Sequence, residues 1–192
     1  MADAGLAVSG EGAGPTGAAE NQNTSTKAVI AEPAVPIVAW SGTVEPQWID
    51  ANEHMTSMAY PLLFHPHIVA LFRQIGIDRS YVEERRLSIF QREFRIGYDR
   101  ELRLGDPIEI RTFVIAHDAK RIHHFHELWH TGMAFRAAFV EYLSLHIDLA
   151  TRRTARFPAD VMARLDALGA AFGRIARPDG YGRKIGIPPR RD

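Results

Sequence analysis

The feature that most constrains the fold is the stretch 58–75, whose apolar side chains leave almost no polar face on a helix. Its apolar residues recur at helical spacing and widen into a broad stripe: Tyr60, Leu62, Leu63, Phe64, Ile68, Val69, Leu71, Phe72 and Ile75. Such a helix is stable only when other elements cover it. Gly76 stands where a C-cap belongs, whereas Pro66 predicts a kink or a break. We therefore expect one long, buried helix.

Strand-like runs surround this helix in the sequence. One run precedes it and four follow it: 37–44, 87–98, 106–116, 121–130 and 134–149. The breaks between the later runs contain Gly, Pro or Asp and are typical of hairpin turns. Pro158 opens a second, amphipathic helix that ends near Gly173. This order predicts an α+β fold, with an antiparallel sheet wrapped around one helix and a surface helix at its C-terminal side.

Composition divides the chain into four segments. Residues 1–35 are rich in alanine and glycine without any aromatic residue, so we expect a disordered tail. The main domain is expected over 36–150 and a C-terminal helix over 151–175. Residues 176–192 are rich in proline, glycine and arginine and predict a flexible tail.

The charge balance and the residue types exclude several classes of protein. Lys+Arg and Asp+Glu number 23 each, and a formal net charge of zero argues against a general nucleic-acid binder. The chain has no cysteine, which excludes disulfides, thiolate zinc sites and cysteine nucleophiles. Nothing at the start resembles a targeting signal, and no apolar run is long enough to span a membrane. We expect a soluble, cytoplasmic protein.

A polar loop just before the buried helix is the candidate site. Asp50, Asn52 and His54 alternate along it, and in an extended loop their side chains can converge. Together they would supply a general base, a positioning hydrogen bond and a donor. The helix start behind them offers free N–H groups and a positive dipole end, which suit an oxygen that gains negative charge. The alternative is a plain N-capping loop, in which Asp50 or Asn52 only satisfies helix donors.

The loop Asp50–Met55 resembles the D-x-N-x-H-M signature of hot-dog-fold thioesterases of the 4-hydroxybenzoyl-CoA thioesterase type. The resemblance continues through Phe94–Glu101 and Leu104–Asp106 and covers about residues 37–150. Asp118–His123, together with Phe125–Glu127, is similar to the betainyl-CoA thioesterases linked to bacterial carnitine degradation, some of which are fused to carnitine dehydrogenase.

This resemblance implies a hot-dog domain that pairs into a homodimer or homotetramer, with active sites at the subunit interface. In a distant branch of the family the Asp, Asn and His of the motif are catalytic, and they match Asp50, Asn52 and His54. The stretch Tyr98–Glu101 resembles the segment that carries a catalytic Glu, so Glu101 is the candidate fourth member. No cofactor and no metal are implied.

The sequence departs from the signature at two places. Glu53 stands where many relatives have Gly, and Thr56 and Ser57 stand near a position often held by Asn. A Glu at a glycine position can change the loop conformation, because glycine often supplies torsions that other residues avoid. It also adds a second carboxylate beside Asp50.

The implied reaction is hydrolysis of an acyl-CoA thioester, with betainyl-CoA or another short polar acyl-CoA as substrate. Asp50 would be the nucleophile or the base that activates water, Asn52 would orient it, and His54 would donate a hydrogen bond or carry a proton. Backbone N–H groups at the helix start would hold the thioester oxygen: those near Met55, Thr56 and Ser57.

Two other functions fit the same pattern. A hot-dog enoyl-CoA hydratase has the pattern D-x-N-x-x-H, with His five positions after Asp, whereas His54 follows Asp50 by four. A non-catalytic module that binds acyl-CoA needs none of the three motif residues. The spacing and the presence of all three favour the thioesterase.

Basic residues near turns are candidates for the CoA phosphates, because guanidinium groups suit phosphate oxygens. Lys120 and Arg121 are favoured because the resemblance runs through them, with Arg152 and Arg153 as further candidates. The alternative is that these charges are simply solvated.

The histidine-rich run 123–130 has a metal interpretation and a packing interpretation. His124, His126 and His130 share one face of a strand, but the nearest carboxylate, Glu127, points to the other face. Cross-strand packing or pocket lining is therefore favoured over a metal site. Trp129, Tyr98 and Tyr142 would suit a cage for a quaternary ammonium group, although aromatic residues in strands more often form core.

Overall fold

The computed structural model describes residues 35–186, so the expected N-terminal tail, 1–35, falls almost entirely outside the described residues. The helices are α1 (Ala59–Gln74), α2 (Arg79–Arg85) and α3 (Ala159–Phe172), with a short 3₁₀ helix at Pro46–Trp48. The strands are β1 (Ile37–Thr43), β2 (Leu87–Tyr98), β3 (Pro107–His117), β4 (Arg121–His130), β5 (Phe135–Asp148) and β6 (Arg153–Thr154).

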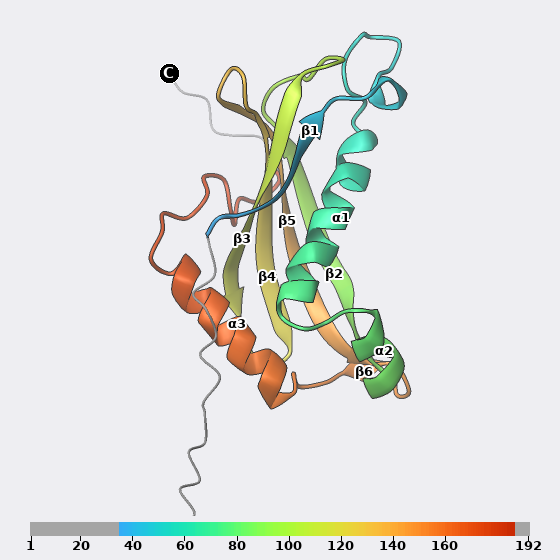
Figure 1. Ribbon diagram of the computed structural model, residues 1–192, viewed down its shortest axis with the longest axis vertical. Helices are drawn as coiled ribbons and strands as arrows, with labels where there is room; N and C mark the ends of the chain where they lie inside the picture. The colour runs from blue at the N-terminus through green and yellow to red at the C-terminus, as the bar shows by residue number, and fades with distance from the viewer. Residues whose placement is uncertain (1–34, 187–192) are drawn as a thin grey trace, which may run out of the picture.

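The strands form one antiparallel sheet in the order β1-β3-β4-β5-β2, with β6 paired to β5 (Figure 1). Alternation along each strand decides which side chains meet which helix. On β3, Ile110 packs in the core cluster beneath α1, whereas Phe113 contacts Phe172 of α3. Helices α1 and α3 therefore cover opposite faces of the sheet, and the α+β hot-dog architecture expected from the sequence is confirmed.

Helix α1 confirms the expected buried helix almost residue for residue. Phe64, Ile68 and Leu71 are buried against the sheet. Pro66 lies inside the helix but does not divide it. Its ring is exposed, and the carbonyl that it leaves without a donor belongs to the exposed Leu62, where water can replace the missing bond.

The short helix α2 was missed by the sequence analysis. Asp78 caps it by accepting a hydrogen bond from the backbone N–H of Tyr81 at 2.9 Å, and this bond with Ser80 lowers the pKa of Asp78. The helix has only seven residues, too short to show a clear apolar period. An Asp three positions before a buried Tyr81 was the available signal.

The tail expected over 176–192 is described only as far as residue 186, and its segment 177–186 lies against the sheet on the face away from α1. Arg136 donates to the carbonyl of Asp179, and Arg95 donates to the carbonyl of Gly180, each at 2.6 Å. The backbone N–H of Gly182 donates to the carboxylate of Glu141 at 2.8 Å. These bonds come from strand side chains that composition alone does not reveal. Among the described residues, no helix is long and apolar enough to cross a membrane.

Candidate functional site

The loop that follows the 3₁₀ helix folds back on itself before α1 begins. Within it the backbone N–H of Asp50 donates to the carbonyl of His54 at 3.1 Å, and that of Glu53 donates to the carbonyl of Asp50 at 3.0 Å. Glu53 has a φ of 63°, a left-handed conformation that favours glycine. The backbone at Glu53 therefore has the left-handed conformation that suits the glycine found there in many relatives.

Two backbone bonds anchor the loop to its surroundings. The N–H of Met55 donates to Leu102 at 2.7 Å, and the N–H of Thr56 donates to Trp48 at 2.8 Å. Met55 is also buried in the core. The N–H groups expected to hold a substrate oxygen at Met55 and Thr56 are thus already used. Within the described chain, those of Ser57 and Met58 have no intramolecular acceptor.

His54 lies between two carboxylates. Its Nδ1 is 3.8 Å from Asp50 Oδ1, and its Nε2 is 4.0 Å from Glu101 Oε1. The three side chains, Asp50, His54 and Glu101, are 33%, 30% and 67% exposed. The distances are longer than hydrogen bonds, and the exposure allows water or substrate to reach all three groups. Three of the four predicted catalytic residues therefore meet at one place.

Asn52 is the predicted catalytic residue whose side chain does not join this group. Its backbone N–H donates to Asp50 Oδ1 at 2.8 Å, which fixes the orientation of that carboxylate. Its side chain is exposed. Asn52 therefore orients Asp50, as expected, but does so through its backbone.

Two tyrosines complete the surroundings of the site. The rings of Tyr60, in the first turn of α1, and Tyr98, at the end of β2, meet edge to face with centroids 5.1 Å apart. The Tyr98 hydroxyl donates to the carbonyl of Ser57 at 3.2 Å. Burial, with smaller contributions from Tyr98 and Glu101, raises the pKa of Tyr60 to about 12, so Tyr60 stays protonated. Tyr60 was assigned only to the apolar stripe, because periodicity does not distinguish core from pocket.

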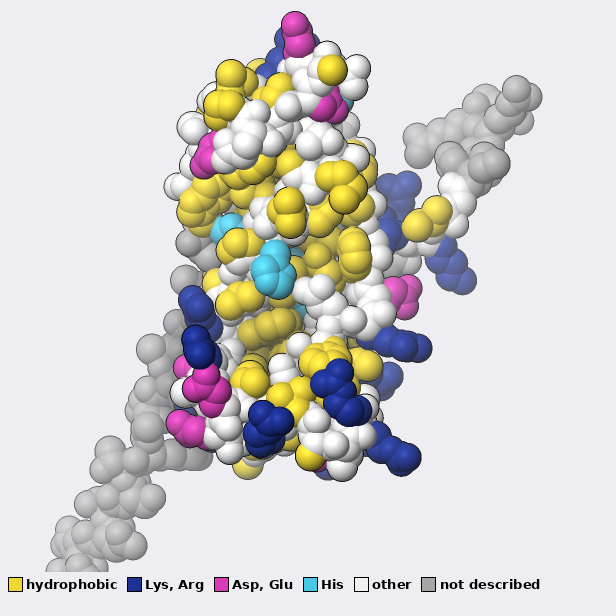
Figure 2. Space-filling view, turned by 90° about the vertical axis from the view of Figure 1, so that its right-hand side faces the viewer, with side chains coloured by type: hydrophobic (Ala, Val, Ile, Leu, Met, Phe, Trp, Pro, Cys, Tyr) yellow, Lys and Arg dark blue, Asp and Glu magenta, His cyan; other side chains and the backbone are white. Residues whose placement is uncertain are grey.

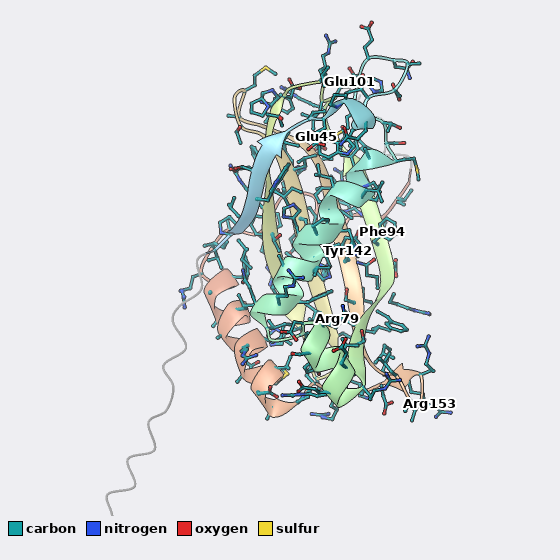
Figure 3. All side chains as sticks on the ribbon, turned by 45° about the vertical axis from the view of Figure 1, so that its right-hand side comes forward. Glu45, Arg79, Phe94, Glu101, Tyr142 and Arg153 are labelled. Carbon is teal, nitrogen blue, oxygen red and sulfur yellow. The ribbon has the colours of Figure 1, made fainter. Side chains whose placement is uncertain are left out.

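We call the end of the sheet that carries this loop the loop end, and the opposite end the far end. Figure 3 shows Glu101 and Glu45 at the loop end, Phe94 and Tyr142 lower down, and Arg153 at the far end. The figure thus separates the candidate carboxylate of Glu101 from Tyr142 and Arg153, two of the other predicted residues.

Lys120 and Arg121 also lie at the far end. Lys120 precedes β4 and Arg121 is its first residue, and the ten residues of β4, at about 3.3 Å each, place both roughly 30 Å from the loop end. Arg121 is already paired with Asp118, with Nε 2.7 Å from Oδ2, and this pairing lowers the pKa of Asp118. A single chain therefore does not bring these predicted phosphate ligands to Asp50. Arg152 and Arg153 lie at the far end as well.

The histidine-rich run packs in the core, which confirms the packing interpretation. His124 Nδ1 and His126 Nε2 share a hydrogen bond of 2.7 Å, and bonds of 2.8 Å link His124 to Ser144 and His126 to Thr112. We call these four residues the histidine chain. Burial lowers the pKa of His124 to about 3 and lowers that of His126 well below its usual value. The described residues contain no group of three potential ligands arranged to hold a metal ion.

Trp129, Tyr98 and Tyr142 do not form the aromatic cage that was the less favoured interpretation of these residues. Tyr142 is buried and stacks between His124 and Phe94, with centroids 5.2 Å and 5.3 Å away. Trp129 lies on the face away from α1, and the Arg111 guanidinium covers its ring at 4.3 Å. Only Tyr98 of the three is near the site.

Comparisons of this chain with a family model, with related sequences and with solved structures agree with one another. Residues 44–165 match the family described as the thioesterase-like superfamily. The chain is 34% identical over 155 residues to the betainyl-CoA thioesterase of Pseudomonas aeruginosa, covering 81% of this chain and 98% of that protein. It is 33% identical over 143 residues to an L-carnitine dehydrogenase/betainyl-CoA thioesterase of Rhizobium meliloti, covering 74% of this chain and 29% of that longer protein.

Two solved structures show similar folds. A hypothetical protein of Staphylococcus aureus, characterised in complex with CoA, has a TM-score of 0.73 at 27% identity, covering 78% of this chain and 94% of its own. A 1,4-dihydroxy-2-naphthoyl-CoA thioesterase from Synechocystis has a TM-score of 0.59 at 12% identity, covering 66% and 93%, and this likeness concerns the fold alone.

Proposed function

The chain belongs to the thioesterase-like superfamily, and from this premise we propose that it hydrolyses betainyl-CoA or an acyl-CoA with a similarly short, cationic acyl group. It is an acyl-CoA thioesterase, which releases a free acid and CoA. The observation that carries the proposal is the meeting of His54 with Asp50 and Glu101 beside the start of α1. The match to a betainyl-CoA thioesterase over nearly its full length supports the choice of acyl group.

In the reaction that we propose, Asp50 is the general base. It accepts a proton from a water molecule while the water oxygen bonds to the thioester carbonyl carbon. The bond from Asn52 N–H leaves the other oxygen of Asp50 available, and the partial exposure of Asp50 admits water. The carbon–sulfur bond then breaks, and the sulfur leaves as CoA with a proton returned through His54.

The carbonyl oxygen gains negative charge in this step and needs donors. We assign that role to the N–H groups of Ser57 and Met58, which have no intramolecular acceptor within the described residues and stand directly before α1. They precede the first residue of α1, where the helix dipole also favours negative charge. Thr56 and Met55 would then support the loop without contacting the oxygen.

We also propose that two chains pair through the face that carries β2 and α1. β2 is an edge strand of twelve residues, yet its Phe90, Phe94 and Tyr98 are 39%, 52% and 50% exposed. Met58 and Leu62 of the α1 region are also exposed, and Figure 2 shows hydrophobic side chains gathered on this side. A long apolar edge of this kind favours pairing with another strand.

Antiparallel pairing of two β2 edges would place the far end of one chain beside the loop end of the other. In that assembly Lys120 and Arg121 could reach CoA only from the partner, and their role as phosphate ligands stays a prediction.

Substitution Phe94→Glu should convert the dimer to monomer, as measured by light scattering. An unchanged mass would contradict this interface. A cytoplasmic location also stays a prediction from the sequence.

The activity is tested by CoA release from a panel of short, aromatic, long-chain and betainyl thioesters, followed with a thiol-reactive dye. Because the chain has no cysteine, it contributes no background signal. We expect the largest kcat/KM for betainyl-CoA. If no thioester releases CoA while acyl-CoA still binds, the thioesterase proposal is wrong and the chain is a binding module.

A further inference from the structure

The chemistry of a short cationic acyl group limits where it can be recognised. In a betainyl thioester a single methylene separates the trimethylammonium group from the carbonyl carbon. The groups that select this cation must therefore lie beside the residues that act on the carbonyl. This argument rests on the proposed function and asks which residues around Asp50 and His54 could face the cation.

Several aromatic rings of the sheet already carry an arginine. Arg100 lies over Phe135 at 5.0 Å, and Arg111 covers Trp129. Phe139 has two guanidinium groups, those of Arg95 and Arg136, at 4.9 Å and 4.7 Å. Among the described residues, none places a guanidinium over Tyr98, whose side chain is half exposed. Within the described chain its ring therefore carries no cation, and in the proposed β2 pairing an acyl group would meet it beside the subunit interface.

The position of the Tyr98 ring is fixed relative to the site. Its hydroxyl donates to the carbonyl of Ser57, the residue whose N–H we assign to the thioester oxygen. The edge-to-face contact with Tyr60 holds the ring from a second side. Two rings that meet at 80° form a corner, and such corners are the building unit of cages that bind quaternary ammonium groups.

Glu101 supplies the negative charge that such a cage needs. In the described chain no lysine or arginine pairs with it, whereas the nearby Asp99 and Glu127 both pair with Arg136. In the described residues the only basic side chain within ion-pair distance of Glu101 is His54, whose Nε2 is 4.0 Å away. Glu101 also follows Tyr98, the last residue of β2, by only three positions, at the end of the strand where the two tyrosine rings meet.

We propose that Glu101 and the Tyr98 ring form the subsite that selects a cationic acyl group. The trimethylammonium group packs against the Tyr98 ring, with Tyr60 behind it, and its charge faces the Glu101 carboxylate. The carbonyl then lies toward His54 and Asp50. Glu101 thus acts on specificity, a role distinct from the fourth catalytic position that the family resemblance implies.

The test uses two thioesters of the same shape, betainyl-CoA and tert-butylacetyl-CoA, in which a neutral carbon replaces the quaternary nitrogen. For each enzyme variant the ratio of kcat/KM for the two substrates is measured. The cation makes betainyl-CoA intrinsically more reactive, but this factor is common to all variants and cancels when their ratios are compared. A change in the ratio therefore reports recognition of the charge alone.

Glu101→Gln should lower the ratio by about fivefold, the upper end of what an exposed charge contact contributes. Tyr98→Leu should lower it by about threefold, while Tyr98→Phe, which keeps the ring, should leave it unchanged. Glu45→Gln is the matched control, because it removes an exposed carboxylate from the same end of the molecule without touching His54. It should also leave the ratio unchanged.

The inference is overturned if Glu101→Gln lowers kcat/KM equally for both substrates, because Glu101 would then act on the reaction and not on the cation. It is also overturned if Glu45→Gln lowers the ratio as much, which would indicate a diffuse field. Failure of the proposed function is a different result: the wild-type enzyme would release CoA from neither thioester.

Discussion

At the loop end, His54 lies between two carboxylates and is open to solvent, whereas His124 and His126 are sealed beneath α1 in the middle of the sheet. Among the described residues neither ring nitrogen of His54 has a partner at hydrogen-bonding distance, whereas all four ring nitrogens of the buried pair have neutral partners. The same residue type is thus placed to exchange protons at one site and prevented from doing so at the other.

The difference shows why a histidine-rich run is a poor guide to function. Burial removes the charged form of a histidine unless an opposite charge compensates for it, and hydroxyl groups of Thr112 and Ser144 cannot. The single histidine in the polar loop has less sequence prominence but the chemically useful surroundings. Substitutions in the two regions should therefore separate activity from stability.

The largest effect is expected at the loop end. His54→Gln should lower kcat by about 100-fold or more, because a positioned proton carrier contributes at least that much. Its free energy of unfolding should hardly change, since the side chain is partly exposed. Steady-state kinetics and urea unfolding of the same preparation check both halves. Near-normal kcat would remove His54 from the mechanism.

The opposite pattern is expected in the histidine chain. His124→Leu should lower the free energy of unfolding by about 2–4 kcal/mol, because His126 and Ser144 both lose a buried partner. The activity of the folded fraction should stay near the wild-type value. Urea unfolding measures the loss, and kinetics at low temperature measures the activity.

A double variant sharpens this prediction. His124→Leu leaves the Ser144 hydroxyl without its buried partner, and adding Ser144→Ala removes that hydroxyl. The double variant should therefore lose less free energy of unfolding than the two single variants lose together. Strict additivity would show that the hydrogen bond between His124 and Ser144 contributes nothing to stability.

Acid should lower the free energy of unfolding through the buried histidines. The folded-state pKa of His124 is about 3, below its unfolded value, so the unfolded chain binds more protons and stability falls as pH decreases below about 6.5. Between pH 7 and pH 5 this histidine alone should cost about 2 kcal/mol. His126 and His67, whose pKa values are also lowered, act in the same direction.

Urea midpoints measured across this pH range test the assignment. The slope against pH should be smaller in His124→Leu than in the wild type. An identical slope in both proteins would show that other groups control the acid sensitivity.

The smallest effect is expected at Glu53. Glu53→Gly should relieve the left-handed conformation and stabilise the protein by at most about 1 kcal/mol, because glycine also gains entropy in the unfolded chain. Thermal unfolding measures this change. A clear loss of stability would show that the Glu53 side chain, and not its backbone, holds the loop.

The sequence was sufficient for the elements that show strong patterns. The apolar period predicted α1 within a residue at each end, and the alternation with turns predicted β2 to β5 closely. The loop motif placed Asp50 and His54 together, and the resemblance added Glu101. These features are local or carried by a motif.

Features that depend on contacts between distant residues could not be predicted. The N–H groups of Met55 and Thr56 donate to the carbonyls of Leu102 and Trp48. These bonds can be identified only in the folded chain. The hydrogen bonds that hold residues 177–186 on the sheet likewise come from Arg95, Arg136 and Glu141 far back in the chain.

The position of Lys120 is a different case, because the sequence contained the signal. The turn before β4 and the turn after it must lie at opposite ends of an antiparallel sheet. The second of these turns is near the loop that carries Asp50, so Lys120 could have been placed at the far end by following the strand directions.

The partly exposed site formed by Asp50 and His54 is where we propose that the thioester is hydrolysed. The most direct measurement is CoA release from betainyl-CoA by Asp50→Asn, with Glu53→Gln as control, since Glu53 is an exposed carboxylate in the same loop. If Asp50 is the general base, Asp50→Asn should lower kcat by about 100-fold or more. The kcat of Glu53→Gln should stay within a few-fold of the wild-type value. Full activity in Asp50→Asn would contradict this role of Asp50.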